Sequence, residues 1–146
     1  MKNQTEQQSH KLMVSAIEEC CDYAGTKGVI LALENHGGPT ATAKGLLNFV
    51  NDVKSPWFAV NLDTGNFSSD DVYAELTEVA PYAVNVQVKV VTRNQARETK
   101  PTDFKRLGQI LKDSNYRGFV VLEYEESGDP RKESEHYLEI LREALV

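Results

Sequence analysis

The stretch Val29–Gly38 reads VILALENHGG, an apolar run followed by an acid, an amide, an imidazole and two glycines. No polar residue interrupts Val29–Leu33, which is typical of a strand buried on both faces. A buried strand that ends in Glu34, Asn35 and His36 brings metal-binding or proton-transferring groups to one rigid edge. An ordinary strand followed by a polar loop has the same pattern, so both interpretations stay open at this point.

The same arrangement recurs three times further along the chain. Apolar segments at 57–62, 82–90 and 119–125 carry polar residues at or near their carboxyl ends. Helical patterns lie between them, with a further helix over 5–24 and another after Pro130. Strict alternation of strands with helix-length connections predicts a parallel sheet with right-handed crossovers. The sequence therefore predicts an α/β fold with four strand–helix units after an N-terminal helix, in a single domain over residues 1–146.

Local signals predict how these elements begin and connect. Thr40 or Thr42 is expected to cap the helix after the first strand, and Ser68 or Ser69 the helix after the second. The segment that follows the third strand, from about 91 to 100, is expected to be a polar loop.

Composition limits the class of protein. The chain has 146 residues, 40% of them hydrophobic, and a net charge of −6. This acidity argues against a nucleic-acid partner, and no apolar run is long enough for a membrane span. Cys20 and Cys21 are adjacent and the only cysteines, so a disulfide framework is excluded and a reducing cytoplasm is the expected location. The helical pattern places Cys20 on the inner face of the first helix, together with Leu12, Met13, Ala16 and Ile17.

Polar side chains from different strands are expected to converge, because ligands bind at the carboxyl ends of parallel strands. Within each strand, alternation puts Asp63 on the same face as Asn61, Lys89 on the same face as Gln87, and Glu125 on the same face as Glu123. Carboxylates that meet in an apolar site repel each other and require a cation, for which a divalent metal is the usual choice.

The expected ligands are oxygen atoms. Glu34, Asp63, Glu123 and the Gln87 carbonyl would suit Mn²⁺, Mg²⁺ or Co²⁺ better than an ion that prefers thiolates, with Zn²⁺ also open.

Four ordered motifs carry a family resemblance: LENHG at 33–37, NLDTGN at 61–66, VQVK at 86–89 and VLEYE at 121–125. Together they resemble the xylose-isomerase-like superfamily of sugar (phosphate) isomerases and epimerases, over nearly the whole chain. The resemblance implies a TIM barrel whose last four strands each supply one metal ligand, here Glu34, Asp63, Gln87 and Glu123. It also implies that Glu34 and Glu123 form the acid/base pair that moves a proton beside a carbonyl.

The resemblance also implies substrate contacts, and it has departures. Lys89 matches a lysine that contacts substrate oxygens, and Asn66 stands where some epimerases have a substrate-contacting histidine. His36 either contacts substrate or caps its loop. The family's usual ligand histidine is Gln87 here, a weaker donor, and the aspartate after the lysine is Val90.

Each site residue also has a structural alternative. Lys89 can pair with Glu123 or Glu125 instead of substrate, and Gln87 can be hydrogen-bonded within the sheet. Arg93 and Arg97 can contact a phosphate, although charged loops are more often simply solvated.

Length is the largest departure, because a full barrel has eight strands in about 250 residues. The chain matches the second half of such a barrel. It is expected to be a fragment of a longer protein, to pair as a homodimer, or to join a complementing half-barrel.

The predicted function is divalent-metal-dependent isomerisation or epimerisation of a sugar or sugar phosphate through an enediolate. One alternative is a metal hydrolase acting at abasic DNA, against which the net charge and the three histidines count. The other is a half-barrel without catalysis.

Overall fold

The computed structural model describes residues 4–96 and 98–146. These residues form five α-helices, two short 3₁₀ helices and six strands, in an order that confirms the predicted strand–helix alternation. The elements are α1 (Glu6–Gly25), β1 (Leu31–Glu34), η1 (Gly38–Thr40), α2 (Ala43–Asp52), β2 (Phe58–Asp63), α3 (Val72–Val79), η2 (Ala80–Tyr82), β3 (Ala83–Lys89), β4 (Val91–Arg93), β5 (Thr99–Pro101), α4 (Phe104–Asp113), β6 (Phe119–Glu123) and α5 (Pro130–Leu145).

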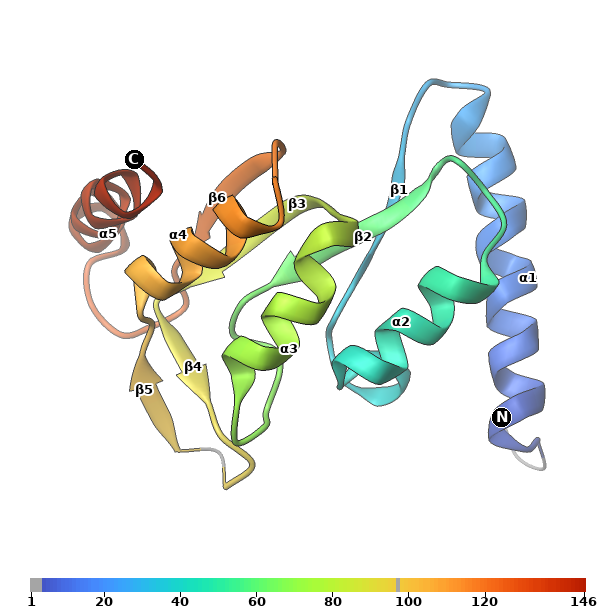
Figure 1. Ribbon diagram of the computed structural model, residues 1–146, viewed down its shortest axis with the longest axis horizontal. Helices are drawn as coiled ribbons and strands as arrows, with labels where there is room; N and C mark the ends of the chain where they lie inside the picture. Colours follow the sequence, from blue (N-terminus) through green and yellow to red (C-terminus); the bar gives the residue numbers. More distant parts are fainter. Residues whose placement is uncertain (1–3, 97) are drawn as a thin grey trace.

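The main sheet is parallel, as predicted, with the strand order β1-β2-β3-β6. Helices α2, α3 and α4 lie across one of its faces, while α1 stands beyond β1 and α5 beyond β6 (Figure 1). Among the described residues, β1 and β6 each pair with a single strand, so the sheet does not close into a barrel. The architecture is an open half of a (β/α) barrel.

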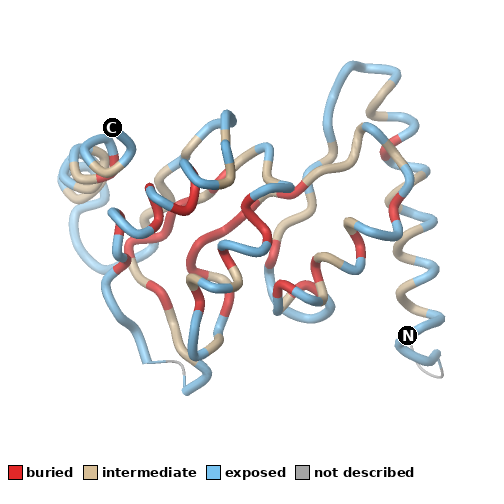
Figure 2. The backbone as a smooth tube through the Cα atoms, viewed as in Figure 1, coloured by how far each residue is buried: buried red, intermediate tan, exposed pale blue. Residues whose placement is uncertain are grey.

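The core lies between the sheet and the helices that cover it. Val86 and Val88 of β3 alternate with polar residues and point toward these helices, where they are fully buried. They belong to one apolar cluster with Leu46 of α2, Leu76 of α3 and Leu107 of α4. Burial is concentrated along β2, β3 and the inward faces of these helices, whereas α1 and α5 are mostly exposed or half-buried (Figure 2). The well-packed part of the chain therefore supports the two central strands.

The opposite face of the sheet has no covering layer among the described residues. Phe119 and Val121 share this inner face with Glu123 and remain 80% and 46% exposed. The expectation that Val29–Leu33 forms a strand buried on both faces is wrong, since β1 begins only at Leu31, and Ile30 just before it is 47% exposed. An edge strand with one neighbour and a bare inner face cannot bury both of its sides.

Side-chain caps start the helices. Thr42, one of the two predicted caps, accepts a hydrogen bond from the Gly45 amide at the start of α2. The prediction of Ser68 or Ser69 as the cap of α3 is wrong, because Asp71 fills that place and accepts from Ala74. Ser68 is instead drawn into a β-bridge with Arg93, which delays the start of the helix.

The segment after β3 is a β-hairpin and not the predicted polar loop. Strands β4 and β5 pair antiparallel, with Thr92 opposite Lys100. The turn between them is held by the Asn94 side chain, which accepts from the Glu98 amide at 2.9 Å. Arg97, which was predicted to lie in this connection, falls outside the described residues. The short strands lack an apolar run, so the pattern did not reveal them.

Helix α1 begins with a capping box between Thr5 and Gln8. Cys21 is buried and Cys20 exposed, and Leu12 is 49% exposed, so the predicted inner face is wrong by about one residue. The helix packs beside an edge strand and therefore presents a narrower face than a helix at the centre of a sheet. No helix in 4–96 or 98–146 combines the length and apolar character that a bilayer span requires.

Candidate active site

The carboxyl ends of the main strands lie at one edge of the sheet, next to a cavity of about 860 Å³. This cavity contains two of the predicted substrate contacts, His36 and Asn66, together with Arg93 of the hairpin. His36 is exposed, and its main-chain amide donates to Thr40 Oγ1 at 3.1 Å. The exposed side chain of His36 can contact a ligand in the cavity, while its main chain closes the loop.

Asp63 is the most deeply placed acid of the site. It is fully buried at the end of β2, and its Oδ1 accepts from the Gly65 amide at 2.8 Å. Its Oδ2 is buried and accepts no hydrogen bond from the described residues. Burial raises the pKa of Asp63 to about 7 and the nearby Glu123 adds to the rise, although the Gly65 amide and the charge of Lys89 lower it.

Lys89 lies among three carboxylates. Its Nζ is 3.5 Å from Asp63 Oδ2 and 3.3 Å from Glu123 Oε2, and it donates to Glu125 Oε2. Burial alone would lower the pKa of Lys89, but the hydrogen bond to Glu125 and the charge of Asp63 raise it above the usual value. Lys89 therefore provides the positive charge that compensates these carboxylates. This arrangement matches the alternative in which Lys89 pairs with Glu123 or Glu125 instead of substrate.

The hydrogen bond from Lys89 also affects the pKa of Glu125. The pKa of Glu125 is lowered, first by the hydrogen bond that it accepts from Lys89. Glu125 itself is exposed and marks the outer rim of the cluster.

Gln87 belongs to a row of side-chain amides on the inner face of the sheet. Its Nε2 donates to Glu123 Oε2 at 3.0 Å, and its Oε1 accepts from Asn61 Nδ2. Asn61 Oδ1 in turn accepts from Asn85 Nδ2 at 2.8 Å. We call Asn85, Asn61 and Gln87 the amide ladder. In this arrangement Gln87 presents its amide nitrogen, and not its oxygen, to Glu123.

Glu34 lies apart from the other predicted ligands. Glu34 pairs in register with Asn61 of β2, which lies two residues before Asp63 in that strand. Its Oε1 accepts a hydrogen bond from Asn66 Nδ2 at 3.0 Å. Within residues 4–96 and 98–146, no three His, Cys, Asp or Glu side chains are grouped so as to hold a metal ion. The structure thus brings Asp63, Gln87, Lys89 and Glu123 together and pairs Glu34 with Asn66.

Positioning residues around Asp63 were missed by the sequence analysis. Asn35 is fully buried, and its side chain exchanges two hydrogen bonds of 2.8 Å with the main chain of Asp63. This pair ties the end of β1 to the end of β2. The signal was present in the sequence, because Asn35 follows Glu34 and therefore points to the opposite side of the strand end.

The Lys89 main chain is held in a similar way. Thr64 Oγ1 accepts from its amide at 3.0 Å, and Thr102 Oγ1 donates to its carbonyl at 2.7 Å. Both threonines are buried, so the backbone at the cluster is fixed from two sides.

The donor chemistry of the cluster fits a hard divalent cation. Asp63 Oδ2 is a buried carboxyl oxygen that has no hydrogen-bond partner among the described residues, and Lys89 Nζ lies within 3.5 Å of both this atom and Glu123 Oε2. Carboxylate oxygens are the ligands that Mg²⁺ and Mn²⁺ prefer. Asp63 and Glu123 are therefore the residues best placed to hold such an ion, and Gln87 could join them only by turning its amide.

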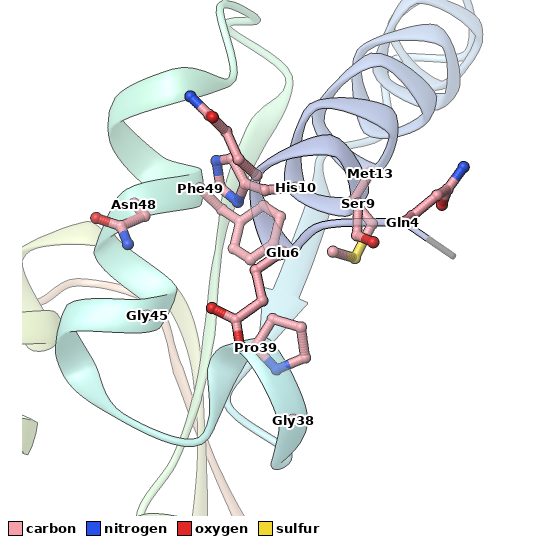
Figure 3. A pocket seen from close by; sticks show the side chains of 11 residues that line it. Gln4, Glu6, Ser9, His10, Met13, Gly38, Pro39, Gly45, Asn48 and Phe49 are labelled. Atoms are coloured by element: carbon pink, nitrogen blue, oxygen red, sulfur yellow. The ribbon is translucent and has the colours of Figure 1, made fainter. Parts of the chain in front are cut away.

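A second cavity of about 650 Å³ lies between the start of α1 and α2 (Figure 3). It contains none of the predicted site residues. His10 Nε2 lies 2.8 Å from Asp52 Oδ2, and its ring centroid is 4.5 Å from that of Phe49. These contacts join the two helices, so this cavity is a feature of helix packing away from the strand ends.

Solved structures share this fold. D-psicose 3-epimerase from Clostridium cellulolyticum H10 matches with a TM-score of 0.79 and 20% identity, over 99% of this chain and 59% of that one. 3-Keto-D-glucoside 4-epimerase from E. coli matches with a TM-score of 0.75 and 18% identity, over 97% and 56%. A xylose isomerase-like TIM barrel protein from Mycobacterium smegmatis, in complex with magnesium, matches with a TM-score of 0.71 and 22% identity, over 100% and 55%.

The chain thus spans a little over half the length of these structures. No curated protein matches it in sequence. The family model described as "Xylose isomerase-like TIM barrel" matches residues 1–144. This match confirms the resemblance of the four motifs, and the chain belongs to the xylose isomerase-like TIM barrel family.

Proposed function

We propose that the chain forms the metal-binding half of an isomerase or epimerase acting on a sugar or sugar phosphate. The observation that carries the proposal is Asp63 Oδ2, a buried carboxyl oxygen with no hydrogen-bond partner among the described residues, near Glu123 at the carboxyl ends of the strands. Membership of the family supports the reaction class. Two of the structurally similar proteins are by name sugar epimerases, and one was solved with magnesium.

In the proposed reaction a carboxylate removes the proton from the carbon beside a carbonyl. The electrons of the broken C–H bond move onto the carbonyl oxygen to give an enediolate, and a carboxylic acid returns a proton to carbon. Glu34 Oε1 accepts a hydrogen bond from Asn66, and Glu34 Oε2, which accepts none from the described residues, would take up the proton. Glu123 is the partner acid, across the sheet edge from Glu34.

A bound divalent cation supplies positive charge that stabilises the oxygen anions of the enediolate. Asp63 and Glu123 would hold it, with Gln87 and Glu34 as the further ligands implied by the family. Lys89, at the centre of the carboxylates, would contact a substrate oxygen once those carboxylates have another cation to neutralise them. His36 and Asn66 would line the sugar site.

Metal binding provides the direct test. Mn²⁺ titration by calorimetry should show binding to wild type and at least tenfold weaker binding to Asp63→Asn and Glu123→Gln. Asp70→Asn, a change of the same kind at an exposed position, should bind like wild type. Equal binding by all four proteins would show that the cluster is not the metal site.

Proton transfer is tested separately. Incubation of the wild-type chain with a ketohexose in D₂O and Mn²⁺ should introduce deuterium at the carbon beside the carbonyl. NMR of the sugar measures this incorporation, which Glu34→Gln should abolish. If a properly folded wild-type chain incorporates none, the isolated chain is a half-barrel without catalysis.

The abasic-site hydrolase gains no further support. The net charge of −6 continues to count against it. Salt-dependent binding to duplex DNA in the micromolar range would favour it again. The cytoplasmic location predicted from the cysteines, and pairing with a second half-barrel, likewise remain predictions.

A further inference from the structure

The amide ladder has a direction. Asn85 Nδ2 donates to Asn61 Oδ1, Asn61 Nδ2 donates to Gln87 Oε1, and Gln87 Nε2 donates to Glu123 Oε2. Every bond therefore runs toward the carboxylate at the end of the row. These side chains occupy inner-face positions of β2 and β3, where a barrel normally packs branched apolar residues.

The carboxylate of Glu123 sets this direction. An ionised carboxylate only accepts hydrogen bonds, so Gln87 must offer its amide nitrogen to it. The oxygen of Gln87 then faces Asn61, which must donate, and the oxygen of Asn61 faces Asn85. The acceptor oxygen of Glu123 thus fixes the orientation of Asn61, two hydrogen bonds away, and through Asn61 that of Asn85.

A second direction has the same shape and the same number of internal bonds. Rotating each amide by half a turn exchanges its oxygen and nitrogen almost without a change in volume. Gln87 would then donate to Asn61, and Asn61 to Asn85. Asn85 is half-buried, so solvent can satisfy the nitrogen that it turns outward. Only the end at Glu123 distinguishes the two directions.

We propose that the amide ladder is a two-state positioning relay, which reverses when a divalent cation is held by Asp63 and Glu123, so that Gln87 turns Oε1 toward the cation. The inference rests on the metal requirement of the proposed function. A cation attracts an amide oxygen and repels an amide nitrogen, which removes the reason for the present direction. Asn61 and Asn85 are the positioning residues that allow a glutamine to serve where the family usually has a histidine.

The test reverses the ladder from its far end, without touching the metal cluster. In Asn85→Asp the new carboxylate can only accept, so it favours an Asn61 that donates to it and offers its oxygen to Gln87, in competition with Glu123 at the other end. Asn61→Leu interrupts the row. The double variant Asn61→Leu/Asn85→Asp keeps the added charge but has no connection to Gln87, and so separates the relay from a long-range charge effect.

The first measurement is made without metal, by ¹H–¹⁵N NMR of the side-chain amides in EDTA. In Asn85→Asp the Gln87 resonances should move toward the positions that they take in wild type saturated with Mg²⁺. In the double variant they should stay where Asn61→Leu places them. If Gln87 does not respond to Asn85→Asp, or responds equally in both backgrounds, the relay does not exist.

The second measurement is the Kd for Mn²⁺. In Asn85→Asp a carboxylate at the far end favours the reversed direction and competes with Glu123, so the ladder opposes the cation less and Kd should fall about fivefold relative to wild type. The same substitution in the Asn61→Leu background should change Kd by less than about twofold. Far-UV circular dichroism checks that each variant is folded, and Asn61→Ala replaces Asn61→Leu if the leucine disturbs the sheet.

The outcomes separate the two proposals. Absence of Mn²⁺ binding by wild type would overturn both the metal requirement and the reversal by a cation. Binding of Mn²⁺ with a Gln87 amide that does not respond would overturn the relay alone.

Discussion

At the scale of single residues, the cluster is organised around Lys89. Its ammonium group compensates the charges of Asp63, Glu123 and Glu125, and it can approach them because Gly65 has no side chain. A Cβ atom at Gly65 would lie 2.7 Å from Lys89 Cδ and 3.0 Å from the carbonyl oxygen of Val91. The glycine of the Asp-Thr-Gly motif is therefore needed for the space that it leaves, beyond any role in a turn.

Gly65→Ala should lower the free energy of unfolding by about 1–3 kcal/mol, because the added methyl group forces Lys89 and the backbone of Val91 apart. Urea unfolding measures the loss. The cost should be smaller in a Lys89→Ala background, where the longer part of the lysine is absent. An equal cost in both backgrounds would place the conflict at Val91 and at Lys89 Cβ, 2.9 Å from the added methyl group, because alanine keeps that atom.

Asp63 makes stability depend on pH in the metal-free protein. Its pKa is about 7 in the folded chain and 3.8 as a free group, so the folded state binds more protons than the unfolded state between these values. Stability therefore falls as pH rises from about 4 to about 7, by at most about 4 kcal/mol for the full shift.

Asp63→Asn removes this dependence. In EDTA, the free energy of unfolding of Asp63→Asn minus that of wild type should increase between pH 4 and pH 7, as measured in urea. A constant difference would show that the Asp63 carboxyl keeps its ordinary pKa in the folded chain, and a decreasing difference would show that its pKa is lowered; either result contradicts the prediction.

Alternation along the strands was enough to predict that Asp63, Gln87, Lys89 and Glu123 share one edge, and the structure brings them together. Glu34 shows the limit of that argument. The register between parallel strands places it opposite Asn61, two residues short of Asp63, and no pattern within one strand encodes the offset between two. The orientation of the Gln87 amide also could not be predicted from the sequence, because it depends on hydrogen bonds with Asn61 and Asn85 across the sheet.

At the scale of secondary-structure elements, periodic segments were predicted well and their junctions less so. Helix α4, with apolar residues at regular intervals, lies between the third and fourth strands of the sheet as predicted and begins after its cap Asp103. The hairpin β4–β5 and the cap of α3 were missed together, because the bridge from Ser68 to Arg93 joins two segments that are far apart in sequence. Such contacts override local capping preferences.

The cap of α3 makes a testable element-scale prediction. Asp71→Ala should destabilise the chain by about 0.5–2 kcal/mol, because the Ala74 amide loses its acceptor. Asp71→Asn should keep most of the cap and lose only the exposed pairing with Arg106, at 3.5 Å. Ser68→Ala, at the rejected cap position, serves as the control in thermal or urea unfolding. A larger loss for Ser68→Ala than for Asp71→Ala would contradict the assignment.

At the scale of the whole molecule, the sheet is covered on one face and open on the other within the described residues. The inner face carries Phe119 and Val121 beside the polar cluster, and β1 and β6 each have an unpaired edge. Exposed apolar surface next to free strand edges favours association. A second copy related by a two-fold axis along the barrel would place β6 of each copy beside β1 of the other, with all strands parallel.

We therefore expect the 146-residue chain to self-associate, with a sedimentation coefficient that increases with concentration. Phe119→Lys/Val121→Lys should remain monomeric, because two buried charges oppose closure of the face. Leu12→Lys, a similar change on the exposed side of α1, should associate like wild type. A wild-type chain that is monomeric at every concentration would exclude the homodimer.

The strand order also predicts which strands of the sheet detach most readily. Within residues 4–96 and 98–146, strands β2 and β3 have neighbours on both sides, whereas β1 and β6 have one each. In amide hydrogen exchange, protection should be highest along β2 and β3 and fall outward, since each outer strand can detach without disturbing the rest. Asp63 and Gln87 then stand on the slowly exchanging pair. Glu34 and Glu123, the two groups proposed to carry protons, stand on the strands that fray first, so partial opening of the edges would separate them before the rest of the chain unfolds.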